Sequence, residues 1–228
     1  MYRGEHFMKS KIISILQSKG GGTKTTTCIN LAGALIEKGF KVAIGDMDKE
    51  KPDATLWADN GGEFSSIIHL VTEDNPIEKL NALKMDNDFL ILDTPPNSGT
   101  ASLKAVMLSD IAIIPCAQSS LDKNALTQSI TAAQIANKPY YMFASNIKKN
   151  TKLFQRLQKE IRETQKDLKT YISHSVVAME CQESGQWVGS YRPNCTLHLQ
   201  FKQLSTEIIS LIESLQQPSQ KSVVGESI

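Results

Sequence analysis

The chain has 228 residues, 40% of them apolar and 21% charged, and a formal net charge of +1. This length and composition are ordinary for a globular protein with a substantial buried core. No apolar run approaches the ~20 residues that a membrane-spanning helix needs, and the first residues lack the apolar core of a signal peptide. We therefore expect a cytoplasmic protein whose four scattered cysteines are free thiols.

Short apolar, β-branched runs alternate with helical patterns along the chain, which indicates a mostly parallel, twisted α/β sheet flanked by helices. Ligands of such sheets bind beyond the carboxyl ends of the strands. We expect one domain over residues 9–215, preceded by an N-terminal extension (1–8) and followed by a flexible polar tail (216–228). The predicted elements are a strand at 11–16, a helix from about Lys24 closed by Gly39, strands at 41–46, 88–93 and 110–115, a helix at 121–136, a strand at 139–145, and a terminal helix at 197–215.

The stretch SKGGGTKTT (18–26) lies between the first predicted strand and the first predicted helix. It departs from the common phosphate-loop pattern G-x-x-x-x-G-K-[ST], since Ser18 and Thr23 stand where that pattern has glycine. A strand that runs through glycines into a helix nevertheless presents unpaired backbone N–H groups, which favour an anion. Lys24 can then reach the terminal phosphates, and the Thr25 hydroxyl can ligate Mg²⁺. The alternative is a glycine-rich turn that binds nothing.

The motif K-G-G-x-x-K-[ST] resembles the deviant Walker A loop of the ParA/MinD class of ATPases. Three later segments resemble that class in the same order: GDMD (45–48), LDTPP (92–96) and IIPCAQSSLD (113–122). The resemblance implies a P-loop NTPase fold of the deviant Walker A type, with ATP and Mg²⁺ as ligands. It also implies an ATP-dependent homodimer in which Lys19 touches the nucleotide of the partner subunit, while Lys24 serves its own.

The resemblance also implies roles for single residues. Asp93 would hold Mg²⁺ through water, Asp46 would support the metal side, and Asp48 would orient the attacking water. Asn146, after the fifth predicted strand, would contact adenine, although an asparagine there is equally typical of a turn. The phosphate cradle would consist of Gly20, Gly21, Gly22, Thr23, Lys24 and Thr25, with Thr26 as a further donor.

The sequence departs from the family pattern at two places. Thr23 replaces the glycine that usually precedes the phosphate lysine, so its side chain could crowd the phosphates. Lys49 and Glu50 replace the usual Pro-Gln after the second strand. We therefore expect ATP binding with slow, partner-stimulated hydrolysis.

Two branches of the family fit poorly. The MinD branch ends in a basic membrane-binding helix, whereas the tail after residue 215 has one lysine and no aromatic residue. The nitrogenase iron protein holds its cluster with cysteines, and DTPPNSG (93–99) has none. The terminal helix instead has the pattern of a docked helix, with its apolar residues at Leu199, Ile208, Ile209, Leu211, Ile212 and Leu215.

The charges are distributed unevenly, with twelve acids against four bases in residues 46–93 and eight bases against three acids in 147–170. A helix over 152–169 would gather its apolar residues, Leu153, Leu157, Ile161 and Leu168, on one face. Its opposite face could bind DNA phosphates without reading sequence, or could simply be solvated. The bases on that face are Lys152, Arg156, Lys159, Arg162, Lys166 and Lys169.

These patterns predict a nucleoid-associated, ParA-like ATPase that forms an ATP-sandwich dimer, binds DNA nonspecifically and partitions a plasmid or positions cargo. A ParB-like or other cargo-bound protein would activate it, and no membrane is involved. One alternative is a nucleotide-gated scaffold that recruits a DNA-transfer or secretion complex with little turnover. Another is a small-molecule kinase or ligase, for which the sequence offers no acceptor pocket or lid.

Overall fold

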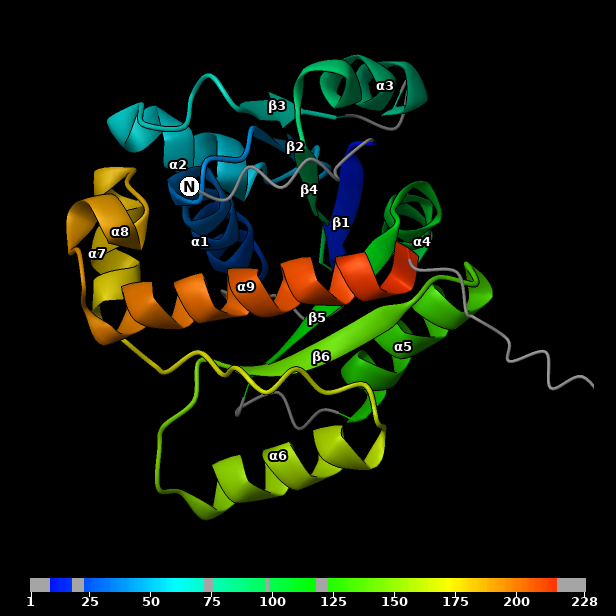
Figure 1. The fold of residues 1–228 in the computed structure, drawn as a ribbon, viewed down its shortest axis with the longest axis vertical. Coiled ribbons are helices and arrows are strands. Elements are labelled where there is room, and N and C mark those ends of the chain that lie inside the picture. The colour runs from blue at the N-terminus through cyan, green and yellow to red at the C-terminus, as the bar shows by residue number, and fades with distance from the viewer. Residues whose placement is uncertain (1–8, 18–22, 72–75, 97–98, 118–122, 217–228) are drawn as a thin grey trace, which may run out of the picture.

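The computed structural model describes residues 9–17, 23–71, 76–96, 99–117 and 123–216 (Figure 1). Within them, six strands form one sheet in the order β3-β2-β4-β1-β5-β6, and all neighbouring strands are parallel. The predicted fold class is thereby confirmed. The strands are β1 (Lys11–Ile15), β2 (Val42–Asp46), β3 (Ile68–Leu70), β4 (Phe89–Asp93), β5 (Ile111–Ala117) and β6 (Tyr140–Ser145).

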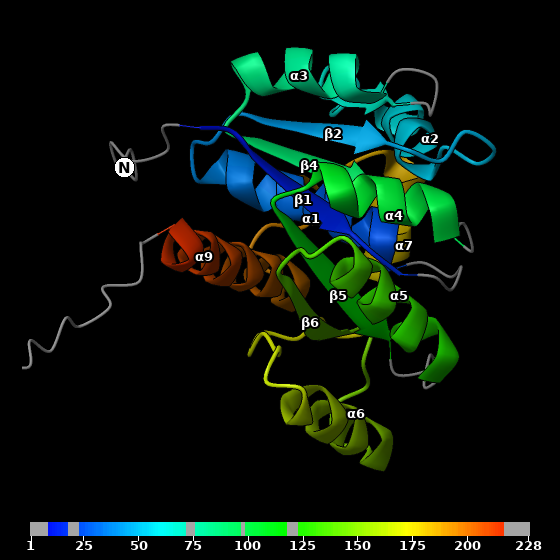
Figure 2. The same cartoon turned by 90° about the vertical axis from the view of Figure 1, so that its right-hand side faces the viewer.

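Helices cover both faces of the sheet, with α1 and α9 on one face and α4 and α5 on the other (Figures 1 and 2). Successive strand residues point to opposite faces, so Ile13 and Ile15 pack under α1 while Ile12 packs on the other side. The helices are α1 (Lys24–Glu37), α2 (Asp53–Gly61), α3 (Pro76–Asp86), α4 (Gly99–Leu108), α5 (Lys123–Ile135), α6 (Lys152–Glu163), α7 (Val177–Ser184), α8 (Val188–Tyr191) and α9 (Thr196–Gln216).

The predicted terminal helix corresponds to α9, but the face that it buries differs in part from the prediction. Ile208 and Ile212 are buried as expected, whereas Leu199 and Leu215 are about half exposed. Leu197, Phe201 and Leu204 are buried in their place and pack into the core beside α1. The four cysteines are free thiols, as predicted.

The predicted helix over 152–169 is wrong in its last third, because α6 ends at Glu163 and Gln165 takes a left-handed φ of 55°. Residues 166–174, which we call the edge strap, then run beside β6. Their backbone pairs with the strand through Leu168 N to Met142 O at 2.7 Å and Ile172 N to Ala144 O at 2.8 Å. Lys166 and Lys169 therefore belong to the edge strap and not to the helix.

The buried face of α6 also differs from the prediction. Phe154, Leu157 and Ile161, spaced by three and four residues, are buried, whereas Leu153 is 50% exposed. Phe154 packs edge-to-face against Tyr171 of the edge strap, with 5.3 Å between ring centroids. Leu168 is buried as expected, but it reaches the core from the edge strap.

Candidate functional site

The polar residues singled out in the sequence converge where β1, β2 and β4 end and α1 begins. Lys19, Gly20, Gly21 and Gly22 lie outside the described residues. Thr23 is the N-cap residue of α1, and its side chain is 5% exposed and makes no capping hydrogen bond. Its carbonyl accepts a hydrogen bond from the Thr27 hydroxyl.

Thr25 and Asp93 form the centre of the site. The Thr25 hydroxyl donates a hydrogen bond to Asp93 Oδ2 at 2.6 Å. Asp93 Oδ1 is buried and has no hydrogen-bond partner within the described residues. Burial raises the pKa of the Asp93 carboxyl to about 7, although the bond from Thr25 opposes this shift. An unpartnered carboxylate oxygen of this kind is costly unless a ligand satisfies it.

The chemistry of this pair fits Mg²⁺, which prefers hard oxygen ligands and keeps several waters. Asp93 Oδ1 and the Thr25 hydroxyl are the oxygen donors that would hold it, directly or through water. The described residues contain no group of three or more His, Cys, Asp or Glu side chains around one point. A cation at this place would therefore use few protein ligands and would depend on water or on a phosphate for the rest.

Lys24, the first residue of α1, is 8% exposed. Burial lowers the pKa of its ammonium, and the nearby carboxylates of Asp93 and Asp48 partly offset this effect. The thiol of Cys28, one turn later, is fully buried, and burial together with Asp93 raises its pKa well above the usual value. Lys24 is thus a largely desolvated cation beside two acids, an arrangement that suits an added anion.

Asp46 and Asp48 organise the loop between β2 and α2. Asp46 is fully buried, and burial raises its pKa. Its Oδ1 accepts from Asp48 N at 3.1 Å, and its Oδ2 accepts from the Thr55 backbone N–H at 3.0 Å and from the Thr55 hydroxyl at 3.1 Å. Asp48 Oδ1 in turn accepts from the N–H groups of Glu50 and Lys51 at 3.2 and 2.9 Å. These hydrogen bonds to Asp46 and Asp48 therefore order the loop that contains Lys49 and Glu50, the two residues that differ from the family pattern.

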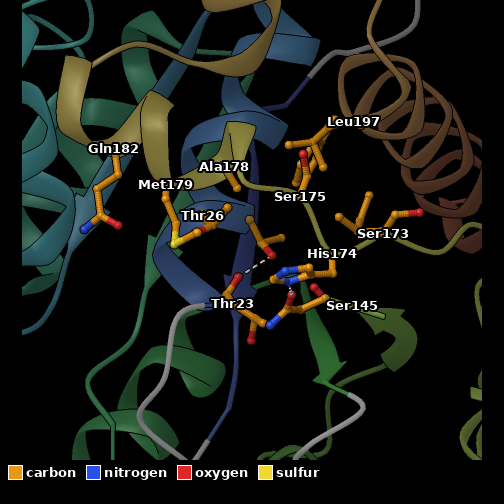
Figure 3. A pocket seen from close by; sticks show the side chains of 14 residues that line it. Thr23, Thr26, Ser145, Ser173, His174, Ser175, Ala178, Met179, Gln182 and Leu197 are labelled. Atoms are coloured by element: carbon orange, nitrogen blue, oxygen red, sulfur yellow. Dashed lines mark hydrogen bonds between the residues drawn. The ribbon is translucent and has the colours of Figure 1, made fainter. Parts of the chain in front are cut away.

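A pocket of about 220 Å³ opens beside the first turn of α1. Figure 3 labels Thr23 and Thr26 from the start of α1, His174 from the edge strap and Met179 from α7 among the side chains that line it. The predicted Asn146 lies here, directly after β6, and its side-chain Oδ1 is 2.8 Å from His174 Nδ1. The other lining residues are Thr27, Ser145, Ile172, Ser173, Ser175, Ala178, Gln182, Leu197 and Phe201.

Residues 172–182 form much of this pocket and were missed by sequence reasoning. Ile172, Ser173 and His174 reach it because the edge strap pairs with β6, and Ala178, Met179 and Gln182 follow on α7. No local motif marks these residues. Only the pairing of residues about 30 positions apart in the chain brings them to Asn146.

The predicted DNA-binding cations do not form a single row. Lys152, Arg156, Lys159 and Arg162 are exposed on α6, which lies beyond β6 in both views (Figures 1 and 2). Arg156 pairs with Glu160 at 3.0 Å and Lys159 with Glu163 at 3.8 Å. Lys166 lies apart from them, with its ammonium over the ring of Tyr141, 5.5 Å from the centroid.

Comparisons with known proteins agree with this geometry. A family model described as an AAA domain matches residues 10–80. The "Maintenance of carboxysome distribution protein A" of Gloeobacter kilaueensis is 32% identical over 54% of this chain and 56% of its own length. "Protein ParA" of Rhizobium radiobacter is 28% identical over 52% of this chain and 54% of its own. The aligned part thus spans little more than half the length of these relatives.

Solved structures share the fold along most of the chain. The MinD cell division protein of Aquifex aeolicus superposes with a TM-score of 0.69 at 15% identity, covering 88% of this chain and 98% of its own. A putative plasmid partition protein of Borrelia burgdorferi, bound to AMPPNP, superposes with a TM-score of 0.68 at 20% identity, covering 89% and 100%. None of the helices in the described part of the chain combines the length and apolar character that a membrane span needs.

Proposed function

We propose that the chain is a member of the ParA/MinD class of deviant Walker A ATPases, which its similarity to proteins of this class supports, and that it binds ATP with Mg²⁺ and hydrolyses it slowly. One observation carries this proposal, the pair of Thr25 and Asp93, in which the buried Asp93 Oδ1 has no hydrogen-bond partner among the described residues. Lys24 beside it supplies the cation for a triphosphate, and the adjoining pocket offers room for a nucleoside.

In this proposal the residues act as the resemblance implies. Lys24, Thr23, Thr25 and the backbone N–H groups of the loop hold the phosphates, with Thr26 as a further donor from the first turn of α1. Asp48 orients the attacking water, and Asp46 fixes the loop that carries Asp48. Magnesium, when bound, neutralises charge on the phosphates. Lys19 reaches the nucleotide of a second copy, which makes dimerisation depend on ATP.

We further propose that the ATP-bound dimer binds DNA nonspecifically and positions a cargo in the cytoplasm, on the nucleoid, under the control of a ParB-like or other cargo-bound activator. The names of relatives that act in partition and in carboxysome distribution support cargo positioning. The exposed cations of α6 support DNA binding. Lys152 and Arg162 are the most suitable of them, because Arg156 and Lys159 already pair with glutamates on the same helix.

A second candidate is the nucleotide-gated scaffold with little turnover. It is favoured by the Asp48 carboxylate, whose Oδ1 is already engaged by two backbone N–H groups. It is also favoured by the buried Thr23 side chain at the edge of the pocket. Both features could slow hydrolysis without preventing nucleotide binding.

The test is an ATP-dependent shift of unrelated DNA duplexes at two salt concentrations, run beside an ATPase assay. Counterion release makes the proposed binding weaken steeply with salt and ignore sequence. The variant Lys152→Glu/Arg162→Glu leaves both α6 ion pairs intact and should lose DNA retention while keeping nucleotide binding. The control Lys41→Glu/Lys84→Glu makes the same change of net charge elsewhere, with Lys84 in the last turn of α3 as Arg162 is in that of α6.

Each outcome of this test has a definite meaning. Loss of DNA binding in both double variants would indicate a general charge effect and contradict a specific role for α6. Absence of any shift with the wild-type protein, when ATP binding is confirmed, would contradict the partition function and favour the scaffold. Absence of nucleotide binding would contradict both.

A further inference from the structure

We propose that Lys169 of the edge strap and Arg162 of α6 bind one backbone phosphate of the DNA between them. This inference rests on the proposed DNA binding and names a contact within it that the helix alone does not supply. The DNA backbone then runs beside the groove between α6 and the edge strap.

Two hollows beside α6 share the side chains of Gln158 and Arg162. The larger has a volume of about 480 Å³, and its other lining residues are Gln155, Lys159 and Glu163. The smaller, of about 20 Å³, lies between α6 and the edge strap, and its other lining residues are Ala144, Ile161, Asp167, Leu168, Lys169 and Tyr171. A hollow of that size holds one water-sized group, such as a single phosphate oxygen. The larger hollow leaves room for the rest of the phosphate.

The charges around the small hollow are unbalanced. Arg162 and Lys169 both line it, against the single carboxylate of Asp167. Neither cation forms an ion pair with a residue in the described part of the chain, whereas two other cations of α6 pair with glutamates of the same helix. Two neighbouring cations repel each other, and an anion between them removes this cost. The half-buried amide of Gln158 adds a donor of a kind that commonly contacts phosphate.

The backbone of Lys169 is fixed by α9 on one side and by β6 on the other. Glu207 of α9 accepts from Lys169 N at 2.6 Å and from Thr170 N at 3.0 Å. The preceding residue, Leu168, donates its N–H to Met142 O and buries its side chain. The Lys169 side chain itself is exposed. A cation on a fixed backbone loses less conformational freedom on binding than one on a free loop.

Lys166 offers a matched control on the same edge strap. Its ammonium lies over the rings of Tyr141 and Tyr140, 5.5 and 5.9 Å from their centroids. It lines neither hollow. Neutralising Lys166 therefore makes the same change of net charge three residues away from Lys169 and leaves the lining of both hollows unchanged.

The experiment measures DNA affinity over a range of salt concentrations for two unrelated duplexes, with a nonhydrolysable ATP analogue present. Lys169→Gln and Arg162→Gln should each weaken binding to both duplexes by the same factor. They should also lower the slope of log affinity against log salt concentration by up to about 1, the loss of one phosphate contact. Lys169→Arg keeps the charge and should bind as the wild type does, and Lys166→Gln should leave the slope nearly unchanged.

A double variant tests whether the two cations share one phosphate. If they do, Arg162→Gln/Lys169→Gln should lose less affinity than the product of the two single losses. Losses that multiply would place the cations on separate phosphates and contradict the inference. Thermal unfolding and ADP binding, which should be unchanged in every variant, separate loss of the contact from loss of folding.

The remaining outcomes distinguish this contact from the proposed DNA binding as a whole. Unchanged affinity in Lys169→Gln would overturn the inference and leave the DNA on the cations of α6. Equal losses in Lys169→Gln and Lys166→Gln would indicate a general charge effect and overturn it too. A wild-type protein that binds the ATP analogue but neither duplex would contradict the proposed DNA binding itself.

Discussion

Gly61 and Gly185 meet backbone to backbone, so closely that a Cβ atom on Gly185 would overlap the backbone of Gly61. The contact joins the end of α2 to the residue after α7. Two side-chain bonds flank it, from Asn60 Nδ2 to Gln182 O at 3.1 Å and from Trp57 Nε1 to Gln186 O at 3.2 Å. The loop organised by Asp46 leads into α2, and α7 lines the pocket. The contact between α2 and α7 therefore links the Asp46 loop to the pocket.

The glycine contact predicts a large loss of stability in Gly185→Ala. Gly185 has a φ of 66°, and Gly62 has a similar φ of 70° but nothing within 4 Å of its Cβ position. Gly62→Ala should therefore cost only the backbone penalty of about 1 kcal/mol, whereas Gly185→Ala should cost at least ~2 kcal/mol more because α2 and α7 must separate. Chemical denaturation of both variants measures the difference. Equal losses of unfolding free energy in Gly62→Ala and Gly185→Ala would show that the contact between Gly61 and Gly185 adapts to the added methyl group without strain.

The buried face of α6 includes Phe154 but not its neighbour Leu153, so substitutions at these two residues should differ in their effect on stability. Phe154→Ala should lower the free energy of unfolding by about 3 kcal/mol, because it removes a buried ring that packs on Tyr171. Leu153→Ala should change it by less than about 0.5 kcal/mol, because that side chain is half exposed. Urea unfolding of the two variants decides between this face and the one predicted from periodicity, for which the order of effects would be reversed.

The raised pKa of Asp93 predicts a pH dependence of stability in metal-free protein. The folded state keeps this proton up to pH about 7, whereas an unfolded aspartate releases it near pH 4. Folded protein thus holds more protons between these values, so the free energy of unfolding should fall as pH rises through this window and level off above it. Asp93→Asn keeps an acceptor for Thr25 and should lack this component, gaining up to roughly 4 kcal/mol over wild type between pH 4 and 8. The measurement is the free energy of unfolding against pH, in EDTA, for the wild-type protein and Asp93→Asn. Parallel curves for the two proteins would contradict the assignment of this pH dependence to Asp93.

Two substitutions at Asp48 separate its role in folding the loop from its proposed role in hydrolysis. Asp48→Asn keeps an oxygen that can accept from Glu50 N and Lys51 N, whereas Asp48→Ala does not. Both should lower ATP turnover at least ~10-fold, since neither offers a carboxylate to the attacking water. Only the alanine variant should also lower the melting temperature. Full turnover in Asp48→Asn would assign Asp48 to loop structure alone.

Dimerisation should depend on Lys19, which precedes α1 in the sequence. A cation that contacts the triphosphate of a second subunit contributes only when nucleotide and partner are both present. Lys19→Ala should bind ADP as the wild type does but stay monomeric with a nonhydrolysable ATP analogue in light scattering. Lys9→Ala, which removes one exposed charge nearby in sequence, is the control. A normal ATP-dependent dimer in Lys19→Ala would contradict the trans role.

The central strands were predictable because they are short, buried and β-branched. The run at 88–93 corresponds to β4 (Phe89–Asp93), and the strand-end aspartates at 46 and 93 come together because parallel strands end at one edge of the sheet. The edge strand β3 has only three residues, and α2 and α3 bury few apolar side chains. Their patterns are too weak to stand out from loop sequence.

The C-terminal end of α6, and the part of the pocket that residues 172–182 form, could not be predicted from the sequence. Helical periodicity continues in the sequence as far as Leu168, but the left-handed Gln165 and the pairing of Leu168 with Met142 redirect the chain. That choice depends on a contact across 26 residues, which local patterns do not encode. His174 reaches Asn146 for the same reason, so the sequence predicts one partner of this hydrogen bond and not the other.

The edge strap has a consequence for how copies of this protein can meet. It occupies backbone groups along the outer side of β6, including the N–H and carbonyl of Met142 and the N–H of Ile147. An open edge of this kind would template strand addition and, in the end, aggregation. With these groups occupied, a neighbouring molecule cannot pair with them to add a strand at this side of the sheet. A copy that approaches the protein at these positions would therefore make its contacts through side chains, and contacts between charged side chains weaken as the salt concentration rises.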